Sequence, residues 1–123
     1  MTTEELLKIQ DLRERVLKYV TDNPFATYIA AQINNYRMFL DTNVYYSEED
    51  IQHAKQMMNA VVDVWIMQVT AGEFVCFLAK KDFIHAAGHA DIINLFMMNF
   101  YVHYIGSIEY NCGDLSLLTK NIL

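Results

Sequence analysis

The chain has 123 residues, of which 54% are hydrophobic and 13% aromatic, and its formal net charge at pH 7 is −6. This length predicts one domain, large enough to bury a core without disulfides or metals. The acidic balance argues against a nucleic-acid partner, because such binding needs clustered Lys and Arg to displace counterions from phosphates.

Cysteine usage indicates the compartment. Cys76 and Cys112 form no close-spaced pair, and the N-terminal segment has no apolar stretch typical of a secretory signal. Isolated thiols are typical of a reducing environment. We therefore expect a cytoplasmic protein.

The first third of the chain predicts two amphipathic helices. Residues 3–20 carry apolar side chains at three- and four-residue steps, and the preceding Thr2 belongs to a Thr-Thr-Glu-Glu sequence that can form a capping box. Asn23 and Pro24 interrupt this pattern, because proline fits the first position of a new helix. The second helix is expected to extend to about Leu40.

A third helix has the clearest start signal. Ser47 can cap it with Asp50 at the third helical position, and its pattern continues to about Thr70. Its buried side is expected to include Met58 and Trp65. Asp63 falls outside that apolar side, which predicts that its carboxylate faces water or a polar groove.

The segment that follows is ambiguous. Residues 74–78 suit either a short helix or a buried strand, because periodicity does not separate short apolar runs. Predicted helices on both sides favour a helix. Gly88 is expected to kink or break the next segment.

An uncharged run from Ile92 to Ile108 predicts a long helix near residues 89–110 that is apolar on almost every side. Such a helix must be buried in protein or lipid. Its about 17 uncharged residues are at the lower limit for crossing a bilayer, and flanking Lys and Arg are missing, which argues against membrane insertion. The predicted fold is therefore all-α, a compact bundle of five or six helices around this helix, in one domain over residues 1–123.

Histidines form the first candidate site. His85 and His89 are four residues apart, so one helix would place them on the same face, as metal ligands require. Asp82 precedes His85 by three residues, and Asp50 has the same relation to His53, a spacing that weakly resembles the Glu-x-x-His pairs of bundle metal sites. If a metal binds, its candidate ligands are His85, His89, Asp82 and His53. The two aspartates also suit helix starts, and no cofactor is expected.

A polar row follows one side of the long helix. Asn99, His103, Gly106 and Tyr110 recur at three- and four-residue steps, and His89 would share the face of His103. An unpaired buried polar group costs about 1–3 kcal/mol, so the row needs partners or water. It indicates an internal network, a solvent-facing edge, a pocket wall or an oligomer seam. The candidate ligand-binding residues are therefore His85, His89, Asn99, His103 and Tyr110.

The supply of methionine and tyrosine favours a binding protein, because both residue types suit adaptable contact surfaces. The expected subunit interface consists of Met97, Phe100, Tyr101 and Tyr104. Catalysis receives little support, since no serine elbow or Gly-rich phosphate loop is present and neither cysteine has a histidine nearby in sequence.

These patterns favour a small intracellular helical protein that acts by binding, as a self-associating interaction or inhibitor module. Its expected partners are a second copy of the chain, another protein or a small ligand. The alternative is a pocket protein that binds a small ligand or metal near the histidines. An enzyme with a histidine as general base is the least favoured hypothesis.

Overall fold

The computed structural model describes residues 1–37 and 47–120. These residues form no strand, and their elements are α1 (Thr3–Asp22), α2 (Phe25–Arg37), α3 (Glu48–Met67), α4 (Glu73–Ala79), α5 (Phe83–Gly88), α6 (Ile92–Cys112) and the short 3-10 helix η1 (Leu115–Leu118). The predicted all-α bundle is therefore confirmed. The expected end of the second helix near Leu40 lies outside the described residues.

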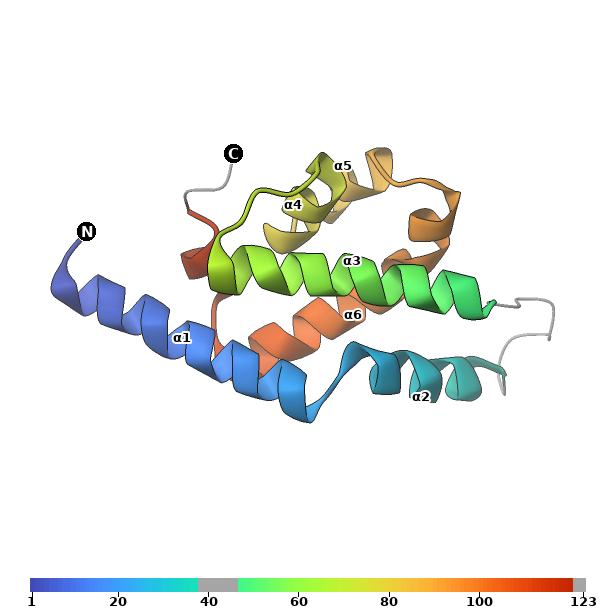
Figure 1. Ribbon diagram of the computed structural model, residues 1–123, viewed down its shortest axis with the longest axis horizontal. Helices are drawn as coiled ribbons and strands as arrows, with labels where there is room; N and C mark the ends of the chain where they lie inside the picture. The colour runs from blue at the N-terminus through green and yellow to red at the C-terminus, as the bar shows by residue number, and fades with distance from the viewer. Residues whose placement is uncertain (38–46, 121–123) are drawn as a thin grey trace.

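Helix α6 is the element that the others surround. It contacts α1, α2, α3 and α5 along its length. In Figure 1, α3 crosses in front of α6, with α1 and α2 on one side of this pair and α4 and α5 on the other. The predicted central helix is confirmed, although it begins at Ile92.

Local capping explains where two helices begin. The Thr2 hydroxyl accepts the backbone N–H of Glu5 at 3.1 Å, which satisfies one of the free donors in the first turn of α1. Ser47 and Asp50 form a complete capping box at α3, with reciprocal bonds of 3.1 and 3.2 Å. Both starts were predicted from sequence because these bonds join residues only three apart.

The segment between α3 and α6 contains two short helices. Residues 74–79 lie in α4, so the choice of helix over strand is confirmed. The expected break at Gly88 is also confirmed, because α5 ends there. Asp91 then starts α6, and its carboxylate accepts the backbone N–H of Asn94 at 2.7 Å.

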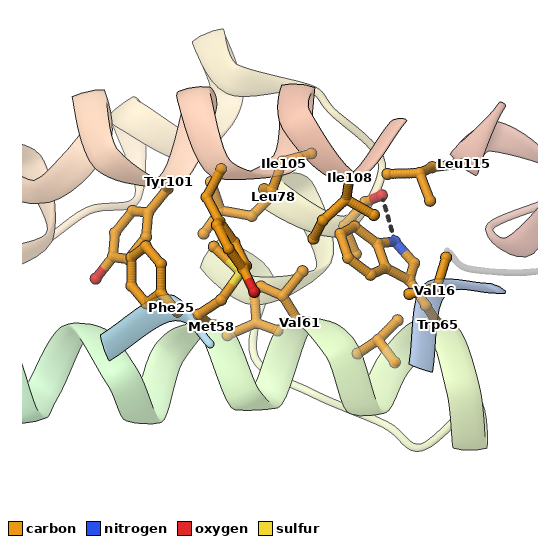
Figure 2. Close-up of a cluster of buried hydrophobic side chains, with 14 of the residues drawn as sticks. Val16, Phe25, Met58, Val61, Trp65, Leu78, Tyr101, Ile105, Ile108 and Leu115 are labelled. Carbon is orange, nitrogen blue, oxygen red and sulfur yellow. Dashed lines mark hydrogen bonds between the residues drawn. The ribbon is translucent and has the colours of Figure 1, made fainter. Parts of the chain in front are cut away.

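The core is formed mainly by the facing sides of α3 and α6. Figure 2 shows Met58 and Val61 of α3 opposite Tyr101, Ile105 and Ile108 of α6. All five side chains are at most 1% exposed. The side of α6 that packs against α3 is therefore its inward side, and the opposite side of α6 points outward.

Trp65 is completely buried and joins α3 to α4. Its indole Nε1–H donates to the carbonyl oxygen of Ala79 at 2.9 Å (Figure 2). Ala79 is the last residue of α4, so its carbonyl oxygen accepts no hydrogen bond within its own helix. The indole therefore takes the place of a C-terminal cap.

We expect Trp65→Phe to lower the free energy of unfolding by about 2–4 kcal/mol, because it leaves the Ala79 carbonyl unpaired and removes buried volume. Urea denaturation followed by circular dichroism measures this change. Ile84→Ala is the control, since Ile84 is 87% exposed and its truncation should change stability by no more than about 0.5 kcal/mol. Equal losses in the two variants would contradict the capping role.

Candidate functional site

The side of α6 that points away from α3 is exposed and mostly apolar. We call it the outward face, and it consists of Ile92, Leu95, Phe96, Asn99, His103, Gly106 and Tyr110. Its large side chains are far from covered: Tyr110 is 91% exposed, Ile92 71%, Phe96 66% and Leu95 50%. Single exposed apolar residues are ordinary on proteins, but here three of them, Ile92, Leu95 and Phe96, lie together at the start of one helix.

The expected interface lies on the opposite side of the helix. Met97, Phe100, Tyr101 and Tyr104 are at most 3% exposed and pack inside the bundle, so the assignment of these four residues to a subunit interface is corrected. The reason is that α6 is apolar on both sides. Sequence alone could not distinguish the side that faces the core.

Hydrogen bonds explain why tyrosines occur on the inward side. The Tyr101 hydroxyl donates to the side-chain oxygen of buried Asn94 at 2.8 Å. The Tyr104 hydroxyl donates to the backbone carbonyl of Asn23 at 2.6 Å, between α1 and α2. Burial raises the pKa of both phenols well above its ordinary value. These tyrosines therefore serve the fold, with each polar tip satisfied inside the chain.

The polar row of Asn99, His103, Gly106 and Tyr110 lies on the outward face. Of the hypotheses for this row, the structure agrees with a solvent-facing side. The prediction that His89 shares a helix face with His103 is wrong. His89 lies beyond the end of α5, and the chain is not helical again until α6 begins.

Gly106 is the smallest residue on the outward face. Apart from its chain neighbours and the nearby backbone of α6, a Cβ atom at this position would meet no atom of the described chain within 4 Å. Glycine inside a helix costs about 0.5–1 kcal/mol relative to alanine. Packing among the described residues gives no reason for this cost, whereas close approach of another molecule would.

The outward face carries no acidic residue, lysine or arginine. The only such residue in α6 is Glu109, which lies to one side. Its Oε2 accepts the Lys81 ammonium at 2.5 Å and the backbone N–H of Leu115 at 3.0 Å. A chain with net charge −6 thus presents one neutral helix surface.

The remaining histidine candidates, His85 and His89, lie against α4. His85 Nδ1 is 2.8 Å from a carboxylate oxygen of Asp82, and His89 Nδ1 is 3.0 Å from a carboxylate oxygen of Glu73. Both imidazole rings stack on Phe77, with centroid distances of 5.3 and 5.2 Å. The candidate ligand-binding residues therefore divide between this cluster and the outward face.

The proposed metal ligands do not form one site. His53 lies near a different carboxylate, with its Nε2 3.8 Å from an oxygen of Asp91. Among residues 1–37 and 47–120, no three histidine, cysteine or acidic side chains come together in a way that could hold a metal ion.

The described part of the surface includes two hollows that none of the candidate ligand-binding residues lines. One, of about 190 Å³, lies beneath the turn between α1 and α2 and includes Phe25, Met58 and Tyr104 in its wall. The other, of about 260 Å³, lies beside Arg15 and Asn111. Neither hollow joins the outward face to the histidine cluster.

Sequence reasoning missed the apolar half of the outward face. A signal was present, because the row of Asn99 and His103 continues backward at helical steps to Phe96, Leu95 and Ile92. Phe77 and Glu73, which hold the histidine cluster, had no comparable signal. Their contacts with His85 and His89 arise from the turn between α4 and α5.

Comparison with known proteins adds no relative: neither a protein-family model, a curated protein nor a solved structure matches the chain. Within the described residues, no helix is both long enough and apolar enough to cross a membrane.

The hydrogen bond from His85 lowers the pKa of the Asp82 carboxyl below its ordinary value of 3.8. This interaction contributes stability above the ordinary pKa and is lost as pH falls through the lowered one. We therefore expect His85→Ala to raise the pKa of Asp82 toward its ordinary value in a carboxyl NMR titration.

Asp114 is an internal control for this titration. Its pKa is lowered by hydrogen bonds from Ser116, which His85→Ala leaves in place. An Asp82 pKa that does not change in the variant, or an equal change at Asp114, would contradict the assigned contact.

Proposed function

We propose that this protein acts by binding, and that it self-associates through the outward face of α6. The observation that supports the proposal is the exposure of Ile92, Leu95, Phe96 and Tyr110 in a single row along a helix that carries no charge there. Clustered exposed apolar side chains, such as Ile92, Leu95 and Phe96, are typical of a contact surface.

Charge favours a second copy as the partner. Two chains of net charge −6 repel each other, and the repulsion is smallest where the surfaces that meet are neutral. The outward face provides such a surface. A strongly basic partner would instead be expected to meet acidic side chains, and this face has none.

The expected association is weak to moderate. Burial of these partly exposed side chains contributes roughly 1–2 kcal/mol each, or roughly 8–16 kcal/mol for the two copies together. Lost translational and rotational freedom costs about 4–15 kcal/mol. These two ranges overlap, so the net free energy of association is small and measurements must extend to high protein concentration.

The separation of the candidate ligand-binding residues also supports this proposal. A pocket protein would need His85, His89, Asn99 and His103 around one cavity. These residues instead divide between the α4–α5 cluster and the outward face, and none lines a described hollow.

We expect Phe96→Glu to abolish self-association, because two carboxylates would enter an apolar contact without a cation to pair with. Sedimentation equilibrium over a wide range of concentrations measures the effect. The unmodified protein should show a concentration-dependent rise in mass, and the variant should stay at 14.3 kDa.

Leu7→Glu is the matched control. Leu7 is 61% exposed on α1, so the change also adds one carboxylate to an exposed apolar position, near a helix start that favours acids. It should leave association unchanged. An unmodified protein that is monomeric at every concentration, or equal effects of the two substitutions, would overturn the proposal.

A further inference from the structure

We infer that the two copies pair their α6 helices antiparallel, about a two-fold axis at the level of Tyr101. The inference rests on the proposed self-association and adds the orientation and register of the partner. Tyr101 itself is buried and marks only the height of the axis. The argument comes from how the residues of the outward face are distributed on either side of this level.

The outward face is complementary to itself in this orientation. Phe96 lies five residues before the level of Tyr101, and Gly106 lies five after it, so the two-fold axis brings them to the same height. Phe96 is 66% exposed, and the space above Gly106 is open to at least 4 Å. A bulky side chain of one copy therefore meets the groove left by the glycine of the other.

Four of the other five positions of the face match in the same register, and the fifth, Leu95, comes level with half-buried Ser107. Asn99 and His103 come to the same height, which places an amide beside an imidazole, two groups that can each donate and accept hydrogen bonds. Ile92 comes level with Tyr110, the two most exposed large side chains of the face. In these two pairs, polar groups meet polar groups and apolar groups meet apolar groups.

A parallel pair lacks this complementarity. It would place Phe96 against Phe96 and Gly106 against Gly106, which crowds one end of the contact and leaves a gap at the other.

The Gly106→Ala substitution should affect assembly and folding in opposite directions. The added methyl group meets nothing within the described chain and replaces glycine by a better helix former, so the thermal unfolding midpoint should rise. The same methyl group occupies the groove for Phe96 of the partner, so the dissociation constant should increase at least tenfold.

Gly88→Ala is its control, because Gly88 is also exposed with nothing within 4 Å and has no positive φ. It should leave the dissociation constant unchanged. An equal dissociation constant for Gly106→Ala and the unmodified protein would overturn the proposed register.

Disulfide cross-linking tests the orientation directly. Phe96→Cys and Gly106→Cys are prepared separately in a Cys76→Ser background, while Cys112 is buried. On mild oxidation a mixture of the two variants should form a covalent dimer several-fold faster than either alone, because only the mixture brings two thiols to one height.

The outcomes distinguish the inference from the proposed function. If the unmodified chain associates in sedimentation but Phe96→Cys couples to itself faster than to Gly106→Cys, the antiparallel register is wrong and self-association stands. If the unmodified chain does not associate and no cysteine pair couples, both are wrong. Preferential coupling of the mixture supports both.

Discussion

The fold depends on one constraint, which is that α6 is apolar on almost every side and its inward side must be covered. The chain supplies α3 and the ends of α1 and α2 for one side, together with α5 at the start of the helix. It leaves the opposite side in water. The uncharged row from Ile92 to Tyr110 therefore includes several of the large hydrophobic side chains that the described structure leaves exposed. Removing apolar surface from water is favourable, and this is the physical reason to look for a partner there.

The inward side of α6 shows how polar groups can be kept within an apolar helix. Asn94 and Tyr101 pair with each other, and Tyr104 reaches the backbone of the turn between α1 and α2. Hydrogen bonds between such buried polar groups are directional, so they specify the orientation of side chains whose apolar packing alone is non-directional. The outward side contains the same kinds of residue, but its aromatic rings lie in solvent. The same residue types thus stabilise the fold on the inward side of α6 and are exposed on its outward side.

Sequence reasoning succeeded where structure is decided locally. The capping box at Ser47 and the break at Gly88 depend on neighbouring residues, and both were predicted. The faces of α6 could not be assigned, because the difference between Phe100 and Phe96 depends only on which helices pack nearby. Sequence placed His89 on the same helix as His103, because the cap at Asp91 is hard to recognise within a continuous apolar pattern. Half of the candidate surface, the polar row, was predicted, and its apolar half was not.

The indole of Trp65 has a consequence for how this molecule can be observed. It is the only tryptophan of the chain, it is completely enclosed, and its N–H is bound to the last carbonyl of α4. Its fluorescence therefore reports whether α3 and α4 are docked. The outward face of α6 contains no tryptophan, so the same signal should be insensitive to events on that face. One intrinsic chromophore thus allows the integrity of the core to be followed independently of whatever the surface of α6 contacts.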